Sequence, residues 1–234
     1  MKLTFLGTRG EIATRTRRHR MHSSLLVSYR DASVMIDCGL DWLGKFERLH
    51  PNAIVLTHAH PDHAWGLKKG APCPVHASQK TWRALEGCKV EDRHLIKERV
   101  PKKICGITFE AFAVEHSILA PAVGYRVSAG HACIFYVPDL IFIHDRAAAL
   151  KDAQIYIGDG ATLTRSFVRK RGKRLIGMHR FARNWRGAER RACRAPSLLI
   201  AVRKLSPPMS ANLPQNSAQW PPSPAWKRVS PTTG

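Results

Sequence analysis

The chain has 234 residues, of which 44% are hydrophobic, enough for one sizeable domain with a packed core. Its 38 Lys and Arg against 17 Asp and Glu give a formal charge of +21, which favours polyanionic partners such as nucleic acid unless these residues are simply solvated. No apolar run has the length of a membrane helix, and the first strand breaks too early for a secretory signal. The six cysteines form no CxxC pair and indicate reduced thiols, so we expect a cytoplasmic protein without membrane contact.

Strands and short helices alternate in the first half of the sequence. The apolar and β-branched runs predict strands over residues 2–6, 24–29, 33–36, 53–56 and 74–77. Helical spacing predicts helices over residues 41–49, 62–69 and 78–85. Asp41 and Ser78 are the expected N-caps of the first and third of these helices.

The second half predicts another group of strands. They cover residues 107–114, 123–127, 133–137 and 155–157, with helices expected at about 145–151 and 163–170. Two groups of strands with helices after each predict an α/β fold in which two sheets pack together and helices cover their outer faces.

A dense set of metal-ligand side chains follows the apolar strand 53–56. His58, His60, Asp62 and His63 lie within one short turn, where a buried strand would deliver them rigidly to one edge of a sheet. Imidazole and carboxylate together suit zinc, manganese or iron better than calcium, which takes oxygen ligands. The alternative interpretation is a surface loop that happens to be rich in histidine.

Two further candidate ligands stand where later strands end. His116 follows the strand 107–114, and Asp139 follows the strand 133–137 and one proline. Taken alone, a histidine or aspartate at a strand end is more often a cap or turn residue. Together with the first cluster, both become candidate metal ligands.

These motifs together resemble the metallo-β-lactamase superfamily, and within it the ribonuclease Z and phosphodiesterase members. The resemblance rests on the run 58–63, His116, Asp139, the opening Phe5-Leu6-Gly7-Thr8-Arg9-Gly10 and the turn Ile36-Asp37-Cys38-Gly39. It implies a four-layer αββα sandwich with metals at one edge, between the sheets. It also implies phosphodiester hydrolysis by a hydroxide held on the metals, with RNA as one candidate substrate.

The resemblance assigns the candidate ligands to two ions. His58, His60 and His116 would hold one metal, Asp62 and His63 the other, and Asp139 would bridge them. Asp62 is also the residue that we expect to be catalytic. The cofactor is expected to be zinc, as one or two ions, with manganese or iron as alternatives.

Two groups outside the ligand set are weaker candidates. Asp37 follows a strand and could orient a ligand histidine from outside the metal shell, or could be a turn residue before Gly39. A basic loop could bind substrate phosphates through guanidinium groups, or could be merely solvated. Its candidate residues are Arg15, Arg17, Arg18 and Arg20.

The resemblance covers residues 1–177 and then stops. Relatives of this kind supply one more histidine to the second metal and a Gly-His step upstream of it, whereas here Gly177 is followed by Met178-His179. Residues 178–234 are rich in Arg and Pro, so we expect a C-terminally incomplete domain and a basic, disordered tail. This tail is either a foreign ending produced by a reading-frame shift or a native extension that grips nucleic acid.

Three hypotheses for function follow. The first is a metal-dependent phosphodiesterase, which the basic charge favours. The second is a truncated or degenerate member that binds metal and turns over little. The third is a hydrolase of another ester or thioester class, because fold alone does not fix the substrate. The sequence leaves the oligomeric state open, a homodimer included.

Overall fold

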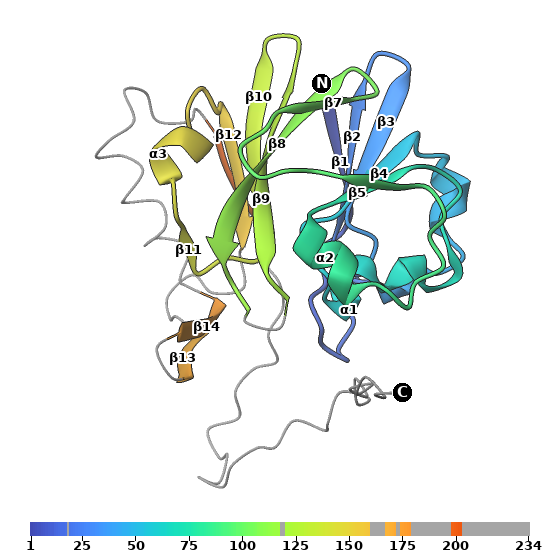
Figure 1. Ribbon diagram of the computed structural model, residues 1–234, viewed down its shortest axis with the longest axis horizontal. Helices are drawn as coiled ribbons and strands as arrows, with labels where there is room; N and C mark the ends of the chain where they lie inside the picture. Colours follow the sequence, from blue (N-terminus) through green and yellow to red (C-terminus); the bar gives the residue numbers. More distant parts are fainter. Residues whose placement is uncertain (18, 118–119, 160–166, 172–173, 179–197, 203–234) are drawn as a thin grey trace, which may run out of the picture.

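The computed structural model describes residues 1–17, 19–117, 120–159, 167–171, 174–178 and 198–202. Within these residues the chain forms two β-sheets that stand face to face, with short helices on their outer sides (Figure 1). No helix among the described residues is long and apolar enough to cross a membrane.

The first sheet contains six strands in sequence order. They are β1 (Lys2–Gly7), β2 (Ser24–Tyr29), β3 (Ala32–Ile36), β4 (Ala53–Val55), β5 (Val75–Ala77) and β6 (Arg93–Leu95). The pairs β1–β2 and β2–β3 are antiparallel, while β3 to β6 are parallel. Parallel neighbours need crossover connections, and short helices supply them. These are η1 (Leu40–Trp42), η2 (Phe46–Leu49), α1 (Pro61–Ala64), η3 (Trp65–Lys69) and α2 (Gln79–Ala84).

The second sheet has the spatial order β11-β8-β9-β10-β12-β15, with β7 paired to β8. Its strands are β7 (Lys102–Ile104), β8 (Ile107–Glu115), β9 (Ala122–Ala129), β10 (Ala132–Val137), β11 (Phe142–Ile143), β12 (Ile155–Asp159) and β15 (Leu198–Val202). Helix α3 (Arg146–Ala149) lies on its outer side, and β13 (Phe167–Arg171) and β14 (Arg174–Met178) form a separate hairpin (Figure 1).

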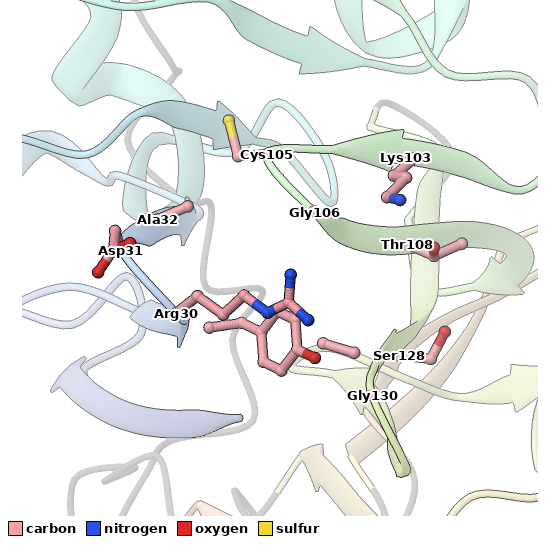
Figure 2. Close-up of a pocket in the computed structure, with 11 residues that line it drawn as sticks. Arg30, Asp31, Ala32, Lys103, Cys105, Gly106, Thr108, Ser128 and Gly130 are labelled. Atoms are coloured by element: carbon pink, nitrogen blue, oxygen red, sulfur yellow. The ribbon is translucent and has the colours of Figure 1, made fainter.

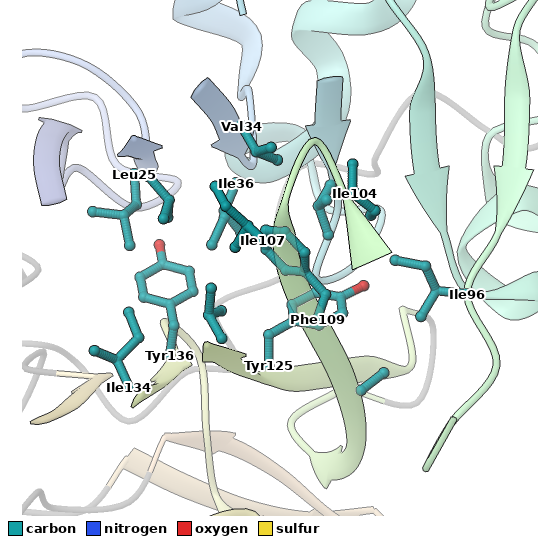
Figure 3. Close-up of a cluster of buried hydrophobic side chains, with 14 of the residues drawn as sticks. Leu25, Val34, Ile36, Ile96, Ile104, Ile107, Phe109, Tyr125, Ile134 and Tyr136 are labelled. Carbon is teal, nitrogen blue, oxygen red and sulfur yellow. The ribbon is translucent and has the colours of Figure 1, made fainter. Parts of the chain in front are cut away.

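Alternation along the strands divides the core into three apolar layers. In β3, Val34 and Ile36 face the second sheet, whereas Met35 packs under the helices of the first sheet. In β10, Tyr136 faces the first sheet and Phe135 faces the side of α3. Figure 3 shows the central layer, where side chains of both sheets meet. Three apolar layers between four layers of secondary structure confirm the predicted αββα sandwich.

Some predicted elements differ from the structure. The helix expected at 41–49 is two 3-10 turns, because Gly44 between them adopts a left-handed φ of +68°. The helix expected at 163–170 is wrong for residues 167–170, which belong to strand β13, while residues 163–166 lie outside the described part. The alternative pairing that the helix prediction missed is the hairpin with β14, whose register spans five residue pairs.

Residues 198–202 correct the prediction that the segment 178–234 is disordered, for that stretch alone. They form β15, which pairs in parallel with β12 over five residue pairs. The five residues Leu-Leu-Ile-Ala-Val are the kind of continuous apolar run that a parallel strand accepts. The remainder of the predicted tail after Met178 lies outside the described residues.

Strand direction separates the two ends of the sandwich. Strands β3, β4, β8 and β10 lead into Asp37, His58, His116 and Asp139, respectively, all at one edge. At the opposite end, the turns β2–β3, β7–β8 and β9–β10 line a cavity of about 560 Å³ (Figure 2). The length of β8, nine residues or roughly 30 Å, separates this cavity from the predicted ligands.

The central apolar layer should dominate stability. Phe109 is fully buried in it, with its ring 6.0 Å from that of Tyr125, so Phe109→Ala should lower the free energy of unfolding by about 3–5 kcal/mol. Phe142 on β11 is 42% exposed, and Phe142→Ala should cost less than about 1 kcal/mol. Urea unfolding of both variants measures the difference, and equal costs would contradict the assignment of the core.

Candidate metal centre

The segment after β4 places four polar side chains in two conformations. Thr57 to His60 is extended, and α1 then begins at Pro61, whose fixed φ suits the first helical position. His60 is the N-cap, and its carbonyl accepts hydrogen bonds from the backbone N–H groups of His63 and Ala64 at 3.0 and 2.9 Å. His58 and His60 therefore approach the site from the extended strand end, and Asp62 and His63 from the first helical turn.

Three imidazole nitrogens converge beside one carboxylate oxygen. His58 Nε2 lies 3.0 Å from His60 Nδ1, which in turn lies 3.2 Å from His116 Nε2. Asp139 Oδ2 lies 3.4 Å from His58 Nε2 and 3.5 Å from His116 Nε2. His58, His116 and Asp139 are buried, and His60 is half-buried.

The donor spacing fits a bound metal. Zinc–nitrogen bonds of 2.0–2.1 Å in a tetrahedron put neighbouring ligand atoms about 3.3 Å apart, close to the separations observed here. A single ring nitrogen of His60 faces two other ring nitrogens, yet it has only one lone pair or one hydrogen to offer. A cation that all three nitrogens share accounts for this convergence better than hydrogen bonds between them.

A second group adjoins the first through the same oxygen. His63 Nε2 lies 3.0 Å from Asp139 Oδ2 and 3.3 Å from Asp62 Oδ2, and all three side chains are buried. Asp139 Oδ2 thus belongs to both groups, as a bridging carboxylate must. Within the described residues this second group has three donors, and His179, the candidate for a fourth, lies outside them.

A fully buried carboxylate stands behind both groups. Asp37, immediately after β3, lies with its Oδ2 2.8 Å from His63 Nδ1 and accepts hydrogen bonds from the Thr57 backbone N–H and hydroxyl at 2.7 and 2.8 Å. The Thr57 hydroxyl is also 3.0 Å from His58 Nδ1. A carboxylate on Nδ1 fixes the ring so that Nε2 points into the site, which is the orienting role expected of Asp37.

The imidazoles are held in the neutral form that a metal requires. Burial, with the neighbouring histidines beside it, lowers the pKa of His60 to about 4. Burial and the adjacent His63 lower the pKa of His58 well below its usual value. Both rings therefore offer lone pairs at pH 7, and the carboxylates of Asp62 and Asp139 bring the negative charge that a dication needs.

The basic loop is tied to the same region through Asp41. This buried carboxylate pairs with the guanidinium groups of Arg9 and Arg15, the latter at 2.7 Å, and accepts the backbone N–H of His22 at 3.0 Å. Although burial alone would raise it, the pKa of Asp41 is held below its usual value by Arg9, His22 and Arg15.

The structure places the predicted loop residues unequally. Arg15 is half-exposed in its pair with Asp41, and Arg17 and Arg20 are exposed. Arg18 lies outside the described residues. Asp41 is not the helix N-cap that the sequence predicts, because it lies inside η1 and Gly39 holds the cap position.

Sequence reasoning did not single out Thr57, Arg9 or the link from Asp41 to His22. Thr57 directly precedes the histidine run, so a hydroxyl at the end of a buried strand was the one available signal. The pairing of Arg9 with Asp41 spans 32 positions and leaves no local pattern to read.

Comparison with known proteins agrees with this arrangement. The chain is 29% identical over 108 residues to the exodeoxyribonuclease WalJ of Streptococcus pneumoniae, covering 42% of this chain and 40% of that protein. It is 28% identical over 153 residues to the ribonuclease Z of Methanococcus maripaludis, covering 54% and 49%. The chain thus spans about half or less of the length of either relative.

The fold also has a solved counterpart. The metallo-β-lactamase fold protein YhfI of Bacillus subtilis superposes with a TM-score of 0.53 at 14% identity, over 66% of this chain and 69% of that one. The family model of the beta-lactamase superfamily domain matches residues 32–194, well over half of the sequence. The chain therefore belongs to the β-lactamase superfamily and has the fold of its metal-dependent hydrolases.

Proposed function

We propose that this chain is a metal-dependent phosphodiesterase that acts on nucleic acid. The observation that carries the proposal is the pair of buried donor groups that share Asp139 Oδ2, at the edge of the sandwich where the basic loop is anchored. Support comes from the exodeoxyribonuclease and ribonuclease Z relatives, whose printed activities both cleave phosphodiesters.

Zinc is the proposed cofactor, with manganese or iron as alternatives. His58, His60, His116 and Asp139 would hold the tighter ion, and Asp62, His63 and Asp139 the second. When bound, such ions supply Lewis-acid charge and lower the pKa of water toward neutrality.

The protein's own residues then orient the chemistry. Asp37 and Thr57 hold the rings of His63 and His58, so that their Nε2 atoms face the centre. Asp62, the proposed catalytic residue, presents a carboxylate oxygen beside His63 that can accept a hydrogen from an attacking water and so aim it.

Charge supports a polyanionic substrate independently of the C-terminal segment. Residues 1–177 contain 28 Lys and Arg against 16 Asp and Glu, a net charge of +12. Phosphate attraction of this kind steers nucleic acids and falls with salt. Arg15, Arg17, Arg18 and Arg20 are the residues that we propose for phosphate contacts.

One observation favours a second candidate function, that of a weakly active metal binder. The second donor group has one imidazole, and two carboxylates of which one is shared. Such a group attracts a dication but offers fewer fixed donors than the first. We therefore infer one tightly held ion per chain and weak phosphodiesterase activity.

The proposed cellular setting is the cytoplasm. The five described cysteines are free thiols, in keeping with a reducing compartment. A homodimer stays a prediction of the sequence.

Metal content should depend on His60. His60→Ala removes the nitrogen that faces two other ligands, so we expect zinc in the purified chain to fall from about one equivalent to near zero. His131→Ala, in the exposed β9–β10 turn at the opposite end, is the matched control. Elemental analysis measures both, and full zinc in the His60 variant would refute the ligand assignment.

Hydrolysis should depend on the shared oxygen. Asp139→Asn should reduce cleavage of bis(p-nitrophenyl) phosphate and of single-stranded RNA or DNA by about 100-fold or more, because it weakens both donor groups. Asp31→Asn, an exposed residue at the opposite end, should leave the rates unchanged. No metal-dependent cleavage of any of the three substrates by the unmodified chain would reject the phosphodiesterase proposal.

The loop arginines should affect long substrates more than small ones. The double variant Arg17→Gln, Arg20→Gln should raise KM for an oligonucleotide several-fold and flatten its salt dependence by about one to two contacts, with little effect on bis(p-nitrophenyl) phosphate. Arg30→Gln with Lys103→Gln, on the distant cavity, is the charge-matched control. Equal salt dependence in both double variants would show that the loop is only solvated.

A further inference from the structure

His22 is a buried histidine beside the second donor group that neither group includes. It is 7% exposed. A Cβ added to Gly39 would lie 2.6 Å from His22 Cβ and 2.1 Å from the Asp62 carbonyl oxygen, so only the glycine backbone separates them. His22 thus borders the turn that carries Asp62 and His63.

Asp41 fixes the position of His22 from two sides. The Asp41 backbone N–H lies 3.1 Å from His22 Nδ1, and the His22 backbone N–H donates to Asp41 Oδ2 at 3.0 Å. The indole N–H of Trp42 donates to the His22 carbonyl at 3.0 Å. These bonds join the basic loop to η1 and leave the ring little freedom to turn.

The same contacts decide which ring nitrogen carries the hydrogen. His22 Nδ1 is also 3.3 Å from Asp41 Oδ2, so it could in principle donate to that oxygen. Oδ2, however, already accepts from Arg9 and from the His22 backbone, and a hydrogen on Nδ1 would point at the Asp41 N–H. Nδ1 is therefore the acceptor, and Nε2 carries the hydrogen in the neutral ring.

A ring in this tautomer is a donor and not a metal ligand. Metal binding needs a bare nitrogen, and Nδ1, the bare one here, is occupied by Asp41. Among the residues that the structure describes, no protein group hydrogen-bonds to His22 Nε2. A largely buried donor without an acceptor is costly, which points to an acceptor that arrives with the substrate.

We propose that His22 Nε2–H donates a hydrogen bond to a non-bridging oxygen of the substrate phosphate at the second donor group. Asp41 is the positioning residue that holds the ring in the required tautomer. The inference rests on the proposed phosphodiesterase function and names a substrate contact within it.

Two substitutions separate the two ring nitrogens. His22→Asn keeps an acceptor near the position of Nδ1, and so the bond from Asp41, but removes the Nε2–H donor. His22→Gln keeps a donor near the position of Nε2. We expect His22→Asn to weaken binding of inorganic phosphate to the zinc-loaded chain, and kcat/KM for bis(p-nitrophenyl) phosphate, by about 10- to 100-fold. His22→Gln should lose less than His22→Asn, and zinc content should be unchanged in both.

The tautomer has its own readout, independent of activity. In the chain labelled with ¹⁵N-histidine, long-range ¹H–¹⁵N spectra should show His22 as the Nε2–H form. Asp41→Asn should loosen this preference, because the paired Arg9 and the clamp on the ring are disturbed together.

The outcomes separate this inference from the proposed function. If the chain cleaves phosphodiesters and His22→Asn matches the unmodified chain in phosphate affinity and kcat/KM, the inference is overturned and the function stands. If phosphate binds in a His22-dependent manner without any cleavage, the function fails and the contact stands. An Nδ1–H tautomer, or loss of zinc in His22→Asn, would overturn the contact directly.

Discussion

The buried carboxylate of Asp37 is the constraint on which the centre depends. It carries a left-handed backbone, with φ of +60°, at the end of β3 and is fully excluded from solvent. A buried carboxylate is tolerated only when hydrogen bonds surround it. Those bonds come from Thr57 after β4, and the ring of His63 in α1 lies against it as well. Satisfying one charge thus fixes the relative placement of three chain segments.

The two sheets contribute unequally to the donor groups. The first sheet supplies the histidine run through β4 and α1, all within six residues of sequence. The second supplies His116 and Asp139 from the ends of β8 and β10, which are antiparallel to the intervening β9. Because β8 and β10 run in the same direction, both ligands reach the same edge. Tyr125 strengthens this alignment, since its hydroxyl donates to the Leu56 carbonyl at 2.8 Å across the central layer.

Much of this could be read from the sequence because the relevant signals are local. The run from His58 to His63 and the single residues after two apolar strands carry their meaning within a few positions. The layered fold followed from strand alternation. The prediction for residues 167–170 failed because helix and strand spacing are ambiguous in a short, basic segment, and hairpin pairing with β14 decides between them.

Other features could not be predicted because they depend on distant partners. Asp41 has the local signature of an N-cap, yet its carboxylate is used by Arg9 and Arg15 from a loop 26 to 32 positions earlier. The strand β15 is recognisable only once the exposed edge of β12 is known. Long-range pairing overrides local propensity in each case.

The distribution of donors over both sheets has a thermodynamic consequence. Apolar packing between β-sheets is non-directional, so the central layer alone sets the spacing of the sheets more firmly than their register. An ion bound by His58 and His60 on one side and His116 and Asp139 on the other would act as a cross-link between segments 56 to 81 positions apart. By mass action, its affinity for the folded state would add directly to stability. Chelation would then loosen the seam between the two halves of the molecule before it unfolded either half.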